Sequence, residues 1–243
     1  MPSVSNVAIG SNMAAAAATK ARHGMNESIA RLSTGIRAMY GGDAAGYSVG
    51  TVHSAEAKSY ASSTRNIENG ISYAQTGESV LLEVANLAQR IRELAIADDN
   101  AALLDSNQIA ALDAEATQIG DAIDAILNNT MFNGVDVVDS AASKSVAINY
   151  SGNASSVTTT VGAGVAITAM AGITDATGAD TTADTFLGKV AESLGNIAAD
   201  LTALKAFQGA ASATSANLAA ASARIIDTDS VSYTHLTLPT IGC

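Results

Sequence analysis

The residues best placed to do chemistry are a serine between two glycines and a histidine close behind it. Gly46, Ser48 and Gly50 match the G-x-S-x-G motif of serine hydrolases, and His53 follows three residues later. In that motif the serine sits on a sharp turn from a strand into a helix, and the histidine base comes from far along the chain. Here the motif lies at the predicted start of a helix, and no strand pattern precedes it. We therefore interpret the glycines as packing positions beside a helix N-terminus and identify no catalytic site.

Metal and disulfide chemistry have few residues to draw on. The sequence has three histidines, His23, His53 and His235. None of them has a second potential ligand at the spacing that a zinc site uses. The single cysteine, Cys243, allows neither a disulfide framework nor a thiolate metal site. We therefore expect no cofactor, no bound metal and no enzyme activity.

Composition narrows the classes of partner. The formal net charge of −11 argues against nucleic acid, whose phosphates require clustered lysine and arginine. No apolar run approaches the roughly 18 residues of a membrane span, and the first basic residue is Lys20, so no Sec-type signal peptide is expected. Apolar residues make up 48% of the chain but aromatic residues only 4%, so little area is buried per residue. Such a chain is expected to gain stability from neighbouring copies.

The elements that carry these residues are long amphipathic helices. Apolar residues recur at alternating spacings of 4 and 3, the heptad pattern of helices that pack lengthwise. Three seams are Tyr73, Gly77, Val80, Val84, Leu87, Ile91 and Leu94; Ile109, Leu112, Ala116, Ile119, Ile123 and Ile126; and Val190, Leu194, Ile197, Leu201 and Leu204. An earlier fourth seam comprises Met25, Ile29, Leu32, Ile36 and Met39. A narrow apolar stripe stabilises a helix only by docking on another helix, so we predict a mainly α fold, an elongated antiparallel helical bundle or coiled-coil rod.

Residues that cap or end helices indicate where each predicted helix begins and stops. We predict helices over 44–98, 104–129 and 184–228, with Asp43 capping the first and Asp105 or Ser106 capping the second. Short β-like runs at 135–138, 145–150, 156–161 and 165–168 predict a small β-hairpin region over about 135–182, and residues 172–184 form a small-residue linker. The expected domains are residues 1–42, a helical region over 43–229, and 230–243, which we interpret as a non-native tail.

Several short segments resemble the N-terminal half of bacterial flagellin, in the same order. They are LSTGIR at 32–37 followed by DAAG at 43–46, TRNIENGISYAQT at 64–76, QRIRELAI at 89–96 and NTMFNG at 129–134. The segment AAASARIIDTD at 219–229 resembles the start of the family's closing region.

The resemblance implies a short flagellin without a large variable surface domain. Such a protein is a structural subunit that self-assembles into the extracellular filament of the bacterial flagellum, for swimming motility, after secretion through the flagellar export apparatus. Residues 1–42 would be disordered in the monomer and would pair with a further C-terminal helix in the filament core. The sequence after Asp229 does not match that helix, so we expect the chain to fold but to polymerise poorly. Implied partners are other copies, the export apparatus, hook-associated and cap proteins, and the innate immune receptor Toll-like receptor 5.

The resemblance also implies an interface that serves both the receptor and neighbouring subunits. The matching positions are Gln89, Arg90, Glu93 and Leu94 on the first long helix and Glu115 on the second. The residues themselves allow a simpler interpretation, in which Ile91 and Leu94 pack inward while Arg90 and Glu93 form an exposed pair.

Two other structural roles stay open from the sequence. A hook-filament junction protein, also called a hook-associated protein, has a similar architecture, although the match at 89–96 favours the filament subunit. An unrelated secreted coiled-coil adhesin is expected to carry β-rich or repeated binding modules, which the sequence does not show. Asn153 and the run Thr158–Thr160 are candidates for glycosylation or for a polar turn.

Overall fold

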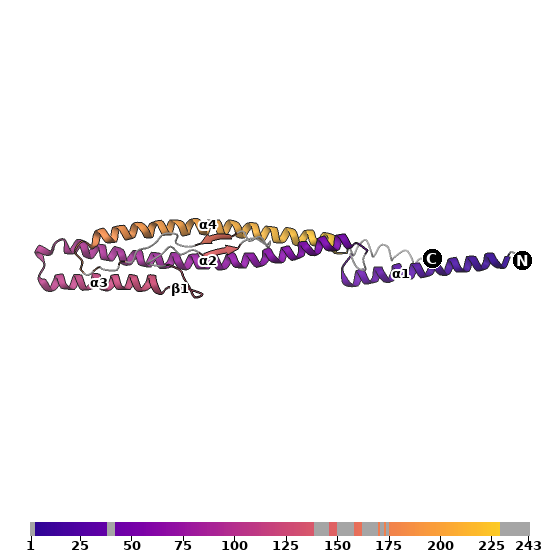
Figure 1. The fold of residues 1–243 in the computed structure, drawn as a ribbon, viewed down its shortest axis with the longest axis horizontal. Coiled ribbons are helices and arrows are strands. Elements are labelled where there is room, and N and C mark those ends of the chain that lie inside the picture. The colour runs from indigo at the N-terminus through magenta and orange to yellow at the C-terminus, as the bar shows by residue number, and fades with distance from the viewer. Residues whose placement is uncertain are drawn as a thin grey trace, which may run out of the picture. The chain divides into compact units, whose positions relative to one another are not determined.

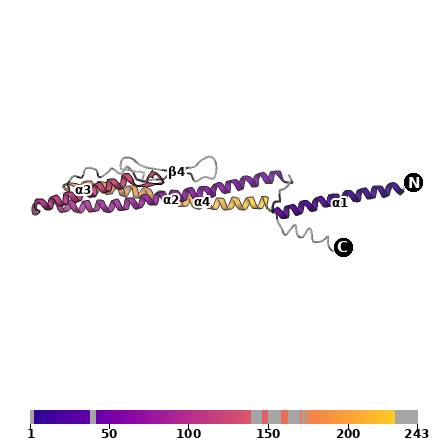
Figure 2. The same cartoon turned by 90° about the horizontal axis from the view of Figure 1, so that it is seen from below.

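The computed structural model describes residues 3–37, 42–138, 146–149, 158–161, 170, 173 and 175–228. These residues contain four α-helices: α1 (Ser3–Thr34), α2 (Ala44–Asp98), α3 (Ser106–Asn129) and α4 (Ala179–Ile226). A short 3₁₀ turn, η1 (Ala101–Leu103), connects α2 to α3. The fold is therefore mainly α, as predicted (Figures 1 and 2).

The chain separates into two compact units. Unit 1 comprises Met1–Ala57 and Ser215–Cys243, and unit 2 comprises Lys58–Thr214, so α2 and α4 each contribute to both. The domain boundary predicted after residue 42 is a different kind of boundary, because it separates a region expected to be disordered in the monomer from one expected to fold. It stays a prediction.

Unit 2 is a bundle in which α2 contacts both other helices (Figure 1). Arg92 of α2 lies 2.9 Å from Asp184 of α4, and Gln208 of α4 donates to Glu68 of α2 at 3.2 Å, so these two helices run antiparallel. Arg90 of α2, two residues before Arg92, donates a hydrogen bond to Glu115 of α3. The charged side chains thus lie along the outside of a bundle whose apolar seams face inward.

The first three predicted seams are confirmed by burial. On α2 the fully buried seam residues include Tyr73, Val84, Ile91 and Leu94, on α3 Ala116 and Ile123, and on α4 Val190, Ile197 and Leu204. The seam residues Val80, Leu87, Ile119, Ile126, Leu194 and Leu201 are partly buried against this core. The heptad pattern therefore predicted which faces meet.

Ser193 occupies a core position of α4 that the seam pattern missed. Its side chain is fully buried between the levels of Val190 and Ile197, and its hydroxyl has no hydrogen-bond partner among the described residues. A buried hydroxyl without a partner loses its hydration and gains nothing in return.

Ser193→Ala is therefore expected to raise the free energy of unfolding by about 1–2 kcal/mol. Urea unfolding followed by circular dichroism measures this change. Ser212→Ala is the control, because Ser212 is an exposed serine of the same helix and its replacement reports helix propensity alone. Equal gains in the two variants would contradict the prediction.

The fourth predicted seam does not pack within the described residues. Met25 and Ile29 are each 54% exposed, and Leu32 and Ile36 are only partly covered, while Met39 lies outside the described residues. Heptad spacing indicates an apolar stripe without indicating which helix covers it, and the pairing expected for residues 1–42 is with a helix of the filament core, which stays a prediction. Residues 3–34 form helix α1, and the expected disorder of the monomer stays a prediction.

The β structure of the described residues consists of two short antiparallel hairpins. Strands β1 (Met131–Phe132) and β2 (Val135–Asp136) pair across a turn in which Asn133 and Gly134 both have positive φ, the geometry that Asn-Gly favours. Tyr73 of α2 holds this hairpin: its ring meets Phe132 edge to face, and its hydroxyl donates to the Asp136 carbonyl at 3.1 Å.

The second hairpin pairs β3 (Val146–Asn149) with β4 (Thr158–Val161), which confirms the runs predicted at 145–150 and 156–161. The run predicted at 165–168 lies outside the described residues, as do Asn153 and the tail at 230–243. The candidate glycosylation run Thr158–Thr160 lies in β4.

Two predicted caps are confirmed and one boundary is corrected. Asp43 accepts a hydrogen bond from the Gly46 backbone at 2.8 Å, and Asp105 forms a capping box with Gln108 at the start of α3. The predicted linker at 172–184 is too long, because α4 begins at Ala179 after a positive-φ turn at Gly178.

Candidate functional site

The serine flanked by glycines lies inside a helix and not on the strand-to-helix turn of the hydrolase motif. Ser48 lies within the first turns of α2, and no described strand leads into it. A Cβ at Gly46 would meet the Asp43 carboxylate, and a Cβ at Gly50 would meet the Ile226 side chain, so both glycines serve packing as predicted. Among the described residues no three histidine, cysteine or acidic side chains gather in a way that could hold a metal ion.

The interface predicted from the resemblance contains a network of charged side chains. Arg90 and Glu93 lie on α2, and Glu115 lies on α3. Arg90 donates to one Glu115 oxygen from Nε at 2.9 Å and from Nη2 at 2.7 Å. Its third nitrogen, Nη1, donates to Glu93 at 3.0 Å. The two carboxylates raise the pKa of Arg90, with the hydrogen bond to Glu115 as the largest cause. The guanidinium is thus fixed in orientation while its side chain stays about half exposed.

The other predicted residues divide between this surface and the core beneath it. Gln89 is exposed beside Arg90. Leu94 is buried and packs with Ala116 and Ala176, so the structure does not place it on the exposed surface. The simpler interpretation of the sequence, in which Leu94 packs inward and Arg90 pairs with Glu93, agrees with this geometry. We call the four exposed residues Gln89, Arg90, Glu93 and Glu115 the Arg90 surface.

Comparison with known proteins identifies the family of the chain. Residues 5–143, more than half of the chain, match the family model described as the bacterial flagellin N-terminal helical region. The chain belongs to the bacterial flagellin family. Flagellin of Xenorhabdus nematophila is 38% identical over 125 residues, which is 50% of this chain and 39% of that protein. Flagellin of Salmonella typhimurium strain LT2 is 38% identical over 120 residues, 49% of this chain and 24% of that protein.

These curated flagellins are much longer than the region they share with this chain, which spans about a quarter to two-fifths of their length. The crystal structure of Bacillus cereus flagellin aligns with a TM-score of 0.43 at 24% identity, over 72% of this chain and 94% of that one. No helix of the described residues is long and apolar enough to span a membrane.

Sequence reasoning missed the hydrogen bonds that three aspartates accept from residues 170–177. Asp98, at the end of α2, is 6% exposed, and Asp113 and Asp124 of α3 contact residues near 170–177. Their sequence signal was weak, because Met170, Ala176 and Thr177 belong to none of the heptad seams.

The Arg90–Glu115 pair is expected to couple α2 to α3 weakly. Arg90→Ala, Glu115→Ala and the double variant form a double-mutant cycle, in which urea unfolding gives the coupling free energy of the pair. The coupling should be favourable at low salt and should shrink as salt is added, because both groups are exposed to solvent. The cycle of Arg92 and Asp184 on the α2–α4 side is the matched comparison. A coupling that does not respond to salt would contradict an exposed ion pair.

Proposed function

We propose that this chain is a subunit of a bacterial flagellar filament and that it works by self-association. Membership of the flagellin family is the observation that supports this role most strongly. The relatives reported above are flagellins, and no observation favours the junction-protein alternative.

The exposed apolar side chains of α1 supply a physical reason for self-association. Val7, Ile9, Met13, Met25 and Ile29 are all more than half exposed, with Met13 at 69%. Their burial against another copy removes apolar area from water. When a patch of one copy meets a different patch of the next, the contact is heterologous and continues into an open helical polymer if it does not close.

A seeded sedimentation assay tests this role. The full chain is mixed with short filament fragments, and polymer is pelleted over a range of concentrations. We expect the unaltered chain to assemble weakly, with a high critical concentration, and the variant Met13→Glu, Met25→Glu, Ile29→Glu to raise that concentration at least tenfold. Its control is Leu103→Glu, since Leu103 is a more exposed apolar residue of unit 2, outside α1. Failure of the unaltered chain to pellet at any concentration, or equal behaviour of both variants, would overturn the proposal.

The Arg90 surface is the second part of the proposal: it binds Toll-like receptor 5 in the monomer and packs against a neighbouring subunit in the filament. Two carboxylates hold the Arg90 guanidinium in place, so little side-chain freedom is lost when a partner binds. Leu94 does not contact the partner; it packs α2 against Ala116 of α3 and so supports the position of the Arg90 surface.

Receptor recognition by the Arg90 surface is tested by measuring the affinity of the Toll-like receptor 5 ectodomain for the immobilised monomer. Arg90→Ala is expected to weaken binding at least tenfold, as for an arginine at the centre of an interface. Arg92→Ala serves as the control, because Arg92 pairs with Asp184 on the α4 side. Equal effects of the two substitutions would argue against a specific role for Arg90.

The remaining partners follow from the proposed role. A filament subunit is secreted by the flagellar export apparatus, meets cap and hook-associated proteins at the ends of the filament, and is extracellular.

A further inference from the structure

The side chain of Arg37 lies between the ends of two helices in unit 1. Its Nε and Nη2 donate to the Ile225 carbonyl oxygen of α4 at 3.3 and 3.0 Å. Nη2 also donates to the carboxylate of Asp43, just before α2, at 2.6 Å. The other oxygen of Asp43 accepts the Gly46 N–H in the first turn of α2. One guanidinium therefore connects the C-terminal end of α4 to the cap of α2.

The backbone at Arg37 attaches the end of α1 to the same place. The Arg37 N–H donates to the Ile226 carbonyl oxygen at 2.7 Å, and the Thr228 N–H donates to the Gly35 carbonyl oxygen at 2.9 Å. These two bonds form an isolated antiparallel bridge. Gly35 ends α1 with φ at +71°, a left-handed conformation that glycine adopts without strain. We give the name Arg37 junction to the side chains of Arg37 and Asp43 and the backbone of residues 35–37 and 225–228.

The charges at the Arg37 junction match the polarity of the two helix ends. Ile225 lies in the last turn of α4, where the final carbonyl groups have no partner within the helix and carry partial negative charge. Asp43 places a carboxylate at the positive end of α2. Two hydrogen bonds lower the pKa of Asp43, the one from the Gly46 N–H more than the one from Arg37. The Arg37 and Asp43 side chains are 43% and 35% exposed, so each contact alone is weak and the junction depends on their combination.

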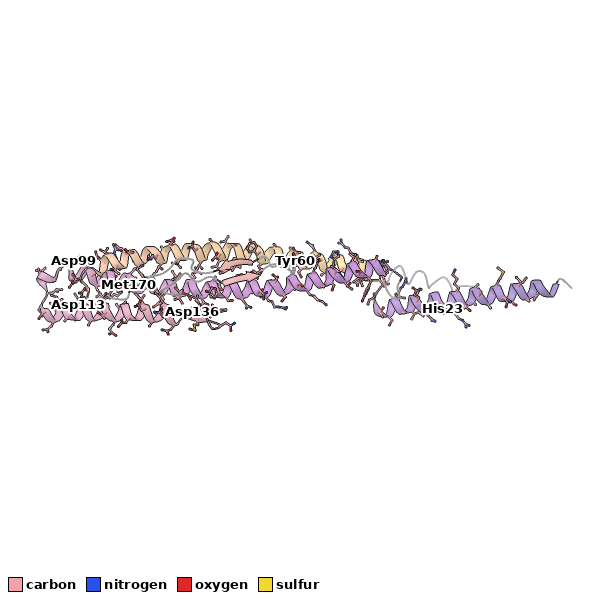
Figure 3. The ribbon with its side chains drawn as sticks, viewed as in Figure 1. His23, Tyr60, Asp99, Asp113, Asp136 and Met170 are labelled. Atoms are coloured by element: carbon pink, nitrogen blue, oxygen red, sulfur yellow. The ribbon has the colours of Figure 1, made fainter. Side chains whose placement is uncertain are left out.

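Helix α1 has little other cover among the described residues. Residues 7–26 are all exposed, and Figure 3 labels His23 among them. Partly covered positions of α1 begin at Glu27, in the turns nearest the Arg37 junction. The connection between α1 and the rest of unit 1 is therefore concentrated at the C-terminal end of this helix.

We propose that Arg37 is a positioning residue for self-association: it attaches the end of α1 to the end of α4 before copies meet. The inference rests on the proposed function, because α1 carries the exposed apolar side chains that are proposed to join copies. A helix that is already held at one end loses less conformational freedom when it docks than a helix that moves freely. Loss of the Arg37 junction therefore raises the concentration needed for assembly without removing any apolar side chain.

Amide hydrogen exchange of the full chain as an unseeded monomer, read by NMR, tests the junction apart from assembly. The Arg37 and Thr228 amides donate the two bridge bonds, so their exchange reports opening of the junction. In Arg37→Ala both should exchange about fivefold faster or more, because charge-assisted hydrogen bonds are lost. The Ile91 amide in the core of unit 2 should not change. Arg65→Ala is the matched control, since Arg65 is an exposed arginine of α2 in unit 2. Unchanged Thr228 exchange in Arg37→Ala, or the same acceleration in Arg65→Ala, would overturn the proposal.

Two conservative variants separate the contributions of charge and geometry. Arg37→Lys keeps the charge but loses the planar fork that reaches Ile225 and Asp43 together, so it should recover only part of the loss seen in Arg37→Ala. Asp43→Asn keeps an oxygen for the Gly46 N–H but removes the charge that faces Arg37, so it should also speed Thr228 exchange. If Arg37→Lys matches the unaltered protein, or if Asp43→Asn slows Thr228 exchange, the described geometry of the junction is wrong.

The seeded sedimentation assay then tests whether the junction positions α1 for assembly. Arg37→Ala should raise the critical concentration about fivefold, because the freed helix must be ordered when it docks, whereas Arg65→Ala should leave it unchanged. Accelerated junction exchange in Arg37→Ala with an unchanged critical concentration would overturn the positioning role while leaving the proposed function intact. If the unaltered chain does not pellet at all, the proposed function fails, and the positioning role fails with it.

Discussion

Gly77→Leu is expected to lower the free energy of unfolding of unit 2 by about 3 kcal/mol. Gly77 is buried on α2, and a Cβ there would already lie 3.1 Å from Cγ1 of Val137 and 3.3 Å from Cδ1 of Ile197. A leucine must place three further carbons in that space, which forces α4 and the chain after β2 away from α2. The better helix propensity of leucine returns only about 1 kcal/mol. Urea unfolding followed by circular dichroism gives the value.

Gly188→Leu is the matched control for this overpacking. Gly188 is an exposed glycine inside α4, and a Cβ there meets nothing within 4 Å. Here leucine should raise stability by about 1 kcal/mol, because only helix propensity changes. The two substitutions are chemically identical and should act with opposite sign. The same sign at both positions would show that the packing around Gly77 is not as described.

Ile123→Ala is expected to cost about 3–4 kcal/mol. Ile123 is fully buried on α3 and belongs to the main core cluster with Ile91 and Leu127. Truncation removes apolar area from the core and leaves a cavity that rigid neighbouring helices fill poorly. Loss of less than about 1 kcal/mol would mean that α3 is loosely attached to unit 2.

Leu103→Ala removes a branched apolar side chain from the surface and controls for Ile123→Ala. Leu103 lies in η1 and is 85% exposed, so its removal should change stability by no more than about 0.5 kcal/mol. A comparable loss at both positions would indicate that burial does not determine the effect.

The helical seams could be predicted from the sequence because their signal is local and repeated. Tyr73, Ile91 and Ile123 each recur at heptad spacing, and each is buried as predicted. The Asn133–Gly134 turn and the Asp105 cap were predictable for the same reason, since each depends on a few adjacent residues and on known backbone geometry.

What could not be predicted depends on contacts between segments far apart in the chain. The seam predicted that Leu94 packs inward, but its contact with Ala176 has no signal in the neighbourhood of residue 94. Met25 and Ile29 show the reverse case: their spacing is that of a core seam, yet both are exposed. The close approach of Ile173 to Gly120 was equally hidden, because Ile173 belongs to none of the heptad seams.

Electron cryo-microscopy of the concentrated full chain, seeded with filament fragments, tests the central claim most directly. That claim is that heptad seams build a helical unit whose exposed apolar faces join identical copies into an open polymer. We predict helical filaments in which α1 is packed against other copies and the α2–α3–α4 core of unit 2 is unchanged. Dispersed single molecules at all concentrations, closed rings, or filaments in which α1 stays exposed to solvent would contradict it.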